Sequence, residues 1–314
     1  MIHKFLKYIE SERRYSALTV RNYRRDLCLF DAWRREVVAK RIAEAEAKGK
    51  VCTDRPEIQY TKPDDIRDWI LYRSKTDKLA PASINRELST LRSFFGYLRE
   101  RGAIKEDIFA HIAALKCPKR LPAAIPATRI TQVLEQTAEK SASEDFEQVR
   151  DALVVLMFYK CGLRLSELIG INIDDLSAQR DAVKVRGKGD KERIVPIVGS
   201  VRTVLNNYLD AVKGQNICNS QEKALFLTVK GCRISRIKVY RLVRSALSDA
   251  QIQGKKSPHV LRHTFATQLM NAGADMRDIQ ELMGHASLRS TQVYTHNSIQ
   301  QLQAVYSKAH PRQK

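Results

Sequence analysis

The amino-acid sequence predicts a mainly α-helical protein of two domains with one small β-sheet. Apolar residues recur at helical spacing through most of the first hundred residues. A basic, proline-rich segment then interrupts the chain, and one pair of short strands follows it. With 314 residues, the chain is long enough for two domains of ordinary size. We expect these domains at residues 1–115 and 128–314, joined by a linker at residues 116–127.

The first domain is predicted to be a bundle of four or five amphipathic helices. A short helix opens the chain, with apolar residues at i, i+3, i+4 and i+7 counted from Ile2. Ser16 is suited to cap a second helix that continues to Gly49, and an aperiodic loop follows. Pro63 and Pro81 each stand at the first position of a further helix, where the missing N–H of proline is tolerated.

The linker is predicted from its prolines. Pro118, Pro122 and Pro126 recur every four residues, a spacing that no helix tolerates. Lys116, Lys119 and Arg120 stand among them, so we expect an extended basic connection.

The second domain is predicted to mix helices with the strand pair. Residues 150–168 are apolar almost all round, which is typical of a buried helix. Ala182–Arg186 and residues 192–198 form the strands, and Gly187 and Gly189 supply the tight turn between them. Helices then dominate to the end of the chain.

The charge of the chain indicates a polyanionic partner. Lysine and arginine number 55 against 35 acidic residues, a net charge of +20. The excess is +8 before Cys117 and +12 from there onward, so both domains are basic and suit duplex DNA or RNA. No apolar run is long enough to span a membrane, and the first residues do not resemble a signal peptide, so we expect a cytoplasmic protein without a membrane partner. The six cysteines form no CxxC pair, so we expect reduced thiols and no zinc site.

Six polar residues of the second domain are candidates for chemistry. Each has an ordinary explanation alone: Arg164 can pair with Glu167, Lys188 can be a solvated turn residue, and Tyr294 can pack. Together they match phosphodiester chemistry without a metal, because guanidinium groups hold phosphate oxygens, histidines move protons and a tyrosine hydroxyl can attack phosphorus. No acidic cluster suits two metal ions, so we do not expect two-metal nuclease chemistry. The candidates are Arg164, Lys188, His259, Arg262, His285 and Tyr294.

These residues and their flanks resemble the tyrosine recombinase (phage integrase) family, especially its Xer-type members. The matching segments are GLRLSEL with Arg164, GKGDKER with Lys188, HVLRH with His259 and Arg262, LMGHAS with His285, and TQVYTH with Tyr294. The first half, with ERRYSALTVRNYRRDL and the linker PKRLP, looks like the helical SAM-like core-binding domain of that family. The resemblance therefore covers nearly the whole chain.

The resemblance implies a C-shaped clamp around duplex DNA, with an α+β catalytic domain. Tyr294 would be the nucleophile that forms a 3′-phosphotyrosyl link, with no need for ATP, metal or cofactor. The resemblance also implies inverted half-sites in the DNA and a tetramer on two sites, which is either a homotetramer or a heterotetramer with a paralogous recombinase. It further implies a DNA translocase as partner and a nucleoid location. Residues 298–314 would be a C-terminal assembly helix.

Several alternatives stay open from the sequence. About a dozen extra residues within 37–60 separate helices that lie closer together in typical Xer proteins. The role can therefore be chromosome dimer resolution at cell division, or integration or excision of a mobile element. Two other functions remain to be weighed: a type IB-like topoisomerase, and a non-catalytic architectural DNA-binding protein. Residues 273–285 also fit a helix-turn-helix, although the family resemblance favours a packing role that presents His285.

Overall fold

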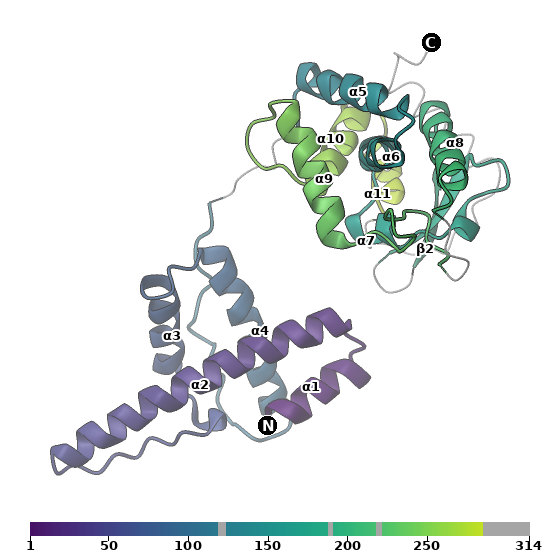
Figure 1. Cartoon of the computed structure of the whole chain (residues 1–314). Coiled ribbons are helices and arrows are strands. Elements are labelled where there is room, and N and C mark those ends of the chain that lie inside the picture. Colours follow the sequence, from purple (N-terminus) through teal and green to yellow (C-terminus); the bar gives the residue numbers. More distant parts are fainter. Residues whose placement is uncertain (119–123, 188–190, 218–221, 285–314) are drawn as a thin grey trace. The chain divides into compact units, whose positions relative to one another are not determined.

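The structure is a computed structural model that describes residues 1–118, 124–187, 191–217 and 222–284. The chain forms two compact units, Met1–Arg120 and Leu121–Lys314, which we describe separately (Figure 1). Within the described ranges, no helix combines the length and the apolar character needed to cross a membrane.

The first unit is helical, as the sequence predicts. Its elements are α1 (Ile2–Ser11), α2 (Ala17–Ala47), the short 3₁₀ helix η1 (Ile58–Tyr60), α3 (Pro63–Lys75) and α4 (Pro81–Glu100). The Ser16 hydroxyl accepts a hydrogen bond from the Thr19 backbone N–H at 3.2 Å, which caps α2. Pro63 and Pro81 each stand at the start of a helix. Phe5, Phe30 and other apolar side chains fill one core between these helices.

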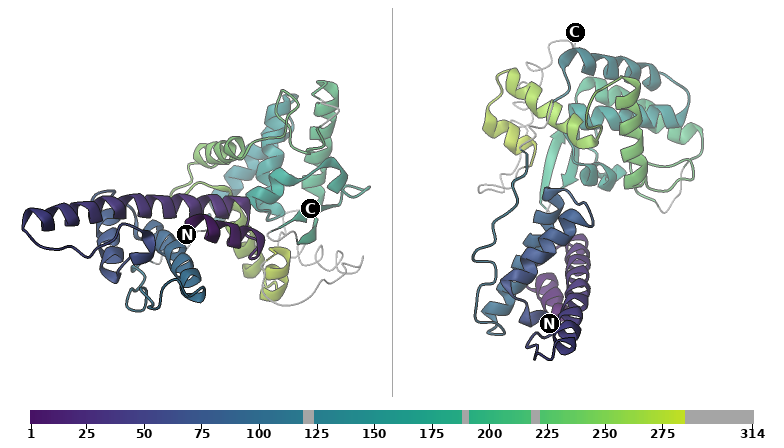
Figure 2. Two further views of the ribbon diagram at one scale, coloured as in Figure 1. Left: turned by 90° about the horizontal axis from the view of Figure 1, so that it is seen from below. Right: turned by 90° about the vertical axis from the view of Figure 1, so that its left-hand side faces the viewer.

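The C-terminal part of α2 extends past α3 and α4 (Figures 1 and 2). A fully buried arginine on α2, Arg34, ties the returning chain to it. Arg34 donates to the Asp65 carboxylate at 3.1 Å and to three backbone carbonyls of residues 55–60 at 2.8–3.1 Å. Arg34 therefore holds the loop after α2 by hydrogen bonds, in addition to the packing of Ile58 in the apolar core of this unit.

The second unit is built around α6 (Phe146–Lys160), which Figure 1 views nearly end-on. Among the described residues, four long helices pack against α6: α5 (Ala127–Ser141), α8 (Gly199–Gly214), α9 (Arg236–Asp249) and α10 (Pro258–Asn271). Because α6 is covered on all sides, its residues from Ala152 to Tyr159 are all buried, which explains its apolar sequence. The remaining elements are α7 (Leu165–Gly170), the 3₁₀ helix η2 (Ile173–Asp175) and α11 (Met276–Leu282).

The predicted strand pair is confirmed as an antiparallel hairpin of β1 (Ala182–Arg186) and β2 (Glu192–Pro196). Ala182 lies opposite Pro196, and Arg186 lies opposite Glu192. β2 ends two residues earlier than we expect from the sequence, at a proline, which has no N–H to donate to a ladder.

The single buried helix expected at residues 150–168 is wrong. Helix α6 ends at Lys160, and α7 begins at Leu165. Arg164, in an extended conformation, is the N-cap residue of α7. The break lies at Gly162, whose φ of +60° is unfavourable for any residue with a side chain. A Cβ atom at this position would lie 2.5 Å from a ring carbon of Phe265, so both conformation and space require glycine.

Gly162→Ala should lower the free energy of unfolding of the second unit by about 3 kcal/mol, through backbone strain and overpacking against Phe265. Urea unfolding monitored by circular dichroism measures this loss. Gly199→Ala is the matched control, because a Cβ at Gly199 meets nothing within 4 Å. An equal effect of the two substitutions would contradict the steric explanation.

Candidate functional site

The site begins where α6 breaks and α7 starts. Glu167 is the third residue of α7, and its carboxylate accepts the backbone N–H of Arg164 at 2.8 Å, as in half of a capping box. The same carboxylate accepts Nη1 of the Arg164 side chain at 2.7 Å. The ion pair that the sequence suggests is therefore present, and it holds Arg164 at the start of the helix.

Two further arginines converge on Glu167 from distant parts of the chain. Arg193 on β2 donates to both carboxylate oxygens, at 2.7 and 2.9 Å. Arg262 on α10 lies 3.6 Å from one of these oxygens and donates to the backbone carbonyls of Gly162 and Met283. We call Arg164, Arg193 and Arg262 around Glu167 the arginine cluster.

The cluster has more positive than negative charge. Burial alone would raise the pKa of Glu167, but the hydrogen bonds and charge of Arg193, and then of Arg164, lower it to about 2. Burial, and then the charge of Arg164, lower the pKa of Arg262 to about 9. At neutral pH one carboxylate therefore faces three protonated guanidinium groups, an arrangement that favours an incoming anion.

His259 lies one helical turn before Arg262 on α10, as the spacing in the sequence predicts. His259 is exposed as a whole residue. Its ring is nevertheless partly desolvated, and this desolvation lowers the pKa of His259 below the usual value for histidine. The charges of Lys255, then Arg262, then Arg164 add to this shift. The imidazole is therefore neutral at pH 7 and can accept a proton.

The structure brings three of the six candidate residues together: Arg164, His259 and Arg262. The other three, Lys188, His285 and Tyr294, lie outside the described residues, and their roles stay predictions. Gly187 and Gly284, which directly precede Lys188 and His285 in the sequence, are described and lie next to the arginine cluster. A Cβ at Gly187 would lie 3.6 Å from Glu167 Oε1, and the Gly284 carbonyl accepts Arg164 Nη2 at 2.8 Å.

Sequence reasoning missed Arg193. A signal was present, because strand alternation places Arg193 on the same face as the buried Val195. A charged residue on the buried face of a strand needs a buried partner, which here is Glu167.

A second buried carboxylate anchors arginines in the first unit. Asp26 on α2 is fully buried and accepts Arg86 of α4 at 2.6 and 3.2 Å and Arg25 at 3.2 Å. The Thr90 hydroxyl donates to it as well, at 3.2 Å. Both guanidinium groups are half exposed, so they are positioned by the protein and available to solvent.

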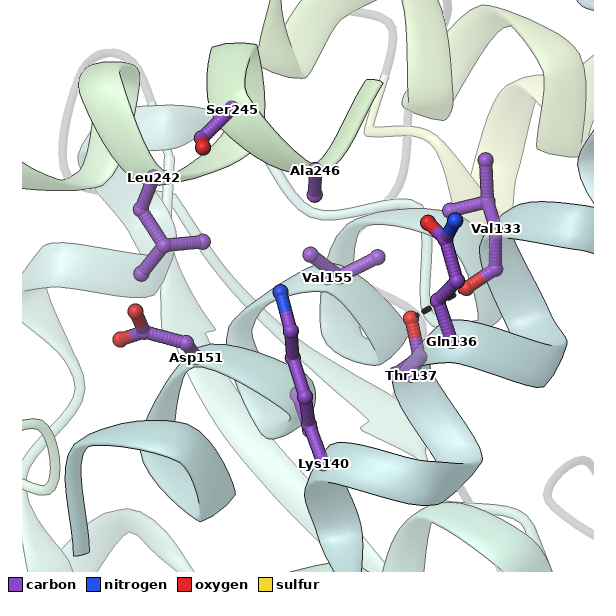
Figure 3. A pocket seen from close by; sticks show the side chains of 10 residues that line it. Val133, Gln136, Thr137, Lys140, Asp151, Val155, Leu242, Ser245 and Ala246 are labelled. Carbon is purple, nitrogen blue, oxygen red and sulfur yellow. Dashed lines mark hydrogen bonds between the residues drawn. The ribbon is translucent and has the colours of Figure 1, made fainter. Parts of the chain in front are cut away.

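A cavity of about 70 Å³ lies between α5, α6 and α9, lined by Lys140, Asp151 and mostly apolar neighbours (Figure 3). Ligand pockets are usually several times larger, and this cavity contains no residue of the arginine cluster. Among the residues that the structure describes, no group of three His, Cys, Asp or Glu side chains is placed to hold a metal ion.

A buried cluster of guanidinium groups beside a histidine has the donors that phosphate-ester chemistry requires. Comparison with known proteins identifies the family. The chain belongs to the phage integrase family, because the model of its catalytic part matches residues 127–301 and the model of its N-terminal SAM-like domain matches residues 2–102. The recognition of a tyrosine recombinase from the sequence is confirmed.

The relatives are Xer recombinases. Tyrosine recombinase XerD of Lacticaseibacillus casei is 34% identical, over 99% of each chain. Tyrosine recombinase XerC of Thermodesulfovibrio yellowstonii is 35% identical, over 100% of this chain and 97% of that protein. The fold is shared with the XerH site-specific recombinase bound to palindromic difH substrate in a post-cleavage complex, with a TM-score of 0.69 and 20% identity over 98% of this chain and 84% of that chain.

Membership in this family makes the chain an enzyme of site-specific recombination, which exchanges DNA strands without metal ions or ATP. The relatives do not favour the topoisomerase or the non-catalytic alternative.

Lys255→Ala should raise the pKa of His259, because it removes the largest of the neighbouring charges that oppose protonation. NMR titration of imidazole-labelled protein measures the midpoint, which should lie below 6.5 in the unchanged chain. Lys256→Ala is the control, since Lys256 donates to Ser248 and is not among the charges that shift His259. An unchanged midpoint in Lys255→Ala would refute this electrostatic picture.

Proposed function

We propose that this chain binds duplex DNA at inverted half-sites and cuts it with Tyr294. The tyrosine oxygen attacks phosphorus, the bond from phosphorus to the 5′ oxygen breaks, and a 3′-phosphotyrosyl link and a 5′-hydroxyl result. The 5′-hydroxyl of a partner strand then attacks this link and restores the tyrosine. Because the link conserves the energy of the phosphodiester bond, rejoining needs no outside energy source.

The other candidate residues share the remaining work in this proposal. Arg164 and Arg262 hold the non-bridging oxygens and stabilise the negative charge of the transition state. His259 and His285 move the tyrosine proton, and Lys188 gives a proton to the leaving 5′ oxygen. Support comes from the adjacency of Gly187 and Gly284 to the cluster, because these residues directly precede Lys188 and His285 in the sequence.

One observation carries the proposal: three guanidinium groups share a single carboxylate in a buried site. An isolated buried positive charge is costly, so the excess charge is unfavourable until an anion enters. A phosphodiester supplies one negative charge and oxygens in the geometry that guanidinium groups bind.

The first unit has the corresponding role of holding DNA in this proposal. Residues 1–115 would be the core-binding domain, residues 116–127 the linker and residues 128–314 the catalytic domain, and the two domains would close as a clamp on the duplex. Arg25 and Arg86 support this role, because the buried Asp26 holds both guanidinium groups while leaving them exposed to phosphates.

We further propose four protomers on two sites, with the C-terminal residues 298–314 joining neighbours. Relatives named XerC and XerD both match the chain, which makes a paralogous partner in a heterotetramer a reasonable alternative to a homotetramer. The mass of the complex on paired sites tests this assembly. Recombination by the purified chain alone tests whether a paralogue or a DNA translocase is needed, and imaging tests a nucleoid location.

Tyr294→Phe should bind DNA normally but lose covalent capture by at least about a thousandfold, because only the hydroxyl attacks phosphorus. A nicked suicide substrate traps the covalent complex, which denaturing electrophoresis then resolves. Tyr240→Phe is the control, since Tyr240 is an exposed tyrosine on α9.

Persistence of the covalent band in Tyr294→Phe would reject Tyr294 as the nucleophile. The same preparation separates a recombinase from a type IB-like topoisomerase. Relaxation of supercoiled plasmid without any recombinant product would contradict the proposed strand exchange.

Arg86→Ala should weaken DNA binding about equally for all sequences and make the slope of log K against log salt less negative by about 0.9, the effect of one lost phosphate contact. Fluorescence anisotropy at several salt concentrations measures this slope. Arg99→Ala is the matched control, because Arg99 is similarly exposed and pairs with the exposed Asp107. An unchanged slope in Arg86→Ala, or an equal change in both variants, would remove Arg86 from the interface.

A further inference from the structure

Arg193 lies beside Arg164 and Arg262, the residues proposed to bind phosphate, but it differs from both in binding the two oxygens of Glu167. Its side chain is 8% exposed, close to the 7% of Arg262, whereas that of Arg164 is 29% exposed. Each of its three nitrogens already has an acceptor within the protein: Nε has the Leu282 carbonyl at 3.0 Å, and Nη1 and Nη2 have the two oxygens of Glu167. Arg193 is therefore bonded to the protein through all three nitrogens and grips the Glu167 carboxylate with two of them, whereas Arg262, within the described residues, hydrogen-bonds only to backbone carbonyls.

The arginine cluster is joined to the end of α11. Three successive carbonyls there each accept from a different arginine: Leu282 from Arg193, Met283 from Arg262 and Gly284 from Arg164. Carbonyls at a helix C-terminus lack partners within the helix and lie at its negative end, so guanidinium groups satisfy both needs.

Glycine at position 284 makes this arrangement possible. A Cβ on Gly284 would lie 2.9 Å from Nη1 of Arg193 and 3.3 Å from Nη1 of Arg164, and φ at Gly284 is +62°. Any larger residue would push these guanidinium groups away from the carbonyls.

Arg193 also controls how Glu167 is shared. The carboxylate bonds directly to Arg193 and Arg164, while Arg262 stays 3.6 Å away. Without Arg193, two carboxylate oxygens would lose their strongest partner, and Arg262 is the nearest remaining cation that could take its place. That movement would draw Arg262 away from the carbonyls of Gly162 and Met283, and from any phosphate placed against it.

We infer that Arg193 is a positioning residue for DNA cleavage: it occupies Glu167 and pins the end of α11, and so holds Arg164 and Arg262 at the separation that the phosphate requires. This inference rests on the proposed function of Arg164 and Arg262. Arg193 touches neither substrate nor reacting atoms, so its effect passes through the other two arginines.

The test compares Arg193→Met and Arg193→Lys with the unchanged full-length chain on the nicked suicide substrate. The single-turnover rate at saturating protein should fall about a hundredfold in Arg193→Met, the cost of a displacement of about 1 Å in a catalytic group. The dissociation constant for DNA should change by less than about threefold. Arg193→Lys should regain part of the rate, because its charge remains but it cannot bind both oxygens.

A double-mutant cycle then separates positioning from general stability. In an Arg164→Ala background, Arg193→Met should cost much less than a hundredfold, because one of the two groups through which it acts is already gone. A purely structural residue would lower the rate by the same factor in both backgrounds.

Arg150 offers a matched control in the same unit. It is fully buried on α6 and bonds to Glu147, Asp151 and the Leu227 carbonyl, none of which belongs to the cluster. Arg150→Met should lower thermal stability in a similar way but leave the cleavage rate of the folded protein within about threefold of the unchanged chain.

The outcomes are distinct. If Arg193→Met cleaves no more slowly than Arg150→Met, or if its effect multiplies with that of Arg164→Ala, Arg193 only stabilises the fold and the inference is wrong. Absence of covalent capture in the unchanged chain would instead overturn the proposed function, and the inference with it.

Discussion

The second unit depends on the charge of one buried carboxylate, that of Glu167. Three guanidinium groups reach it from α7, β2 and α10, elements that lie far apart in the sequence. Without this negative charge the three cations would repel one another in a poorly hydrated site, and removal of one partner from a buried ion pair typically costs 3–5 kcal/mol. Glu167 therefore organises the meeting point of the hairpin, α7, α10 and the end of α11.

The same carboxylate is insufficient to neutralise the cluster. Its low pKa keeps it ionised across the physiological range, yet the balance around it remains positive. A site that is preorganised for an anion and incomplete without one is what transition-state stabilisation requires, because the donors need not reorient when charge develops on the phosphate. In the proposed function, stability and activity are thus linked through Glu167, since it holds together the groups whose excess charge favours an anion.

Much of this arrangement could be predicted from local sequence signals. Proline at helix starts, the Ser16 cap and the glycine-bounded strand pair act over a few residues, and all three predictions are confirmed. The break at Gly162 could not be predicted, because it depends on Phe265, a hundred positions away, occupying the space of a side chain. Arg193 was not predicted for a similar reason. Strand alternation places Arg193 on the buried face, but its partner, Glu167, is distant in the sequence. The contributions of Lys188, His285 and Tyr294 rest on motif and spacing, and stay predictions.

Buried carboxylates recur in this chain, and the exposure of their arginine partners separates structural from functional roles. Asp65 holds Arg34, whose remaining donors all go to backbone carbonyls, so this pair fixes a loop. Asp26 holds Arg86, whose side chain is 44% exposed, and only an exposed side chain can reach a phosphate outside the protein. The cluster at Glu167 combines both arrangements: Arg193 is internal and bonded through all three nitrogens, whereas Arg164 remains accessible. A site that must hold its own geometry and also bind an external anion needs both kinds of arginine, because one that grips a carboxylate with both Nη atoms fixes that carboxylate, while an accessible one offers donors to an anion.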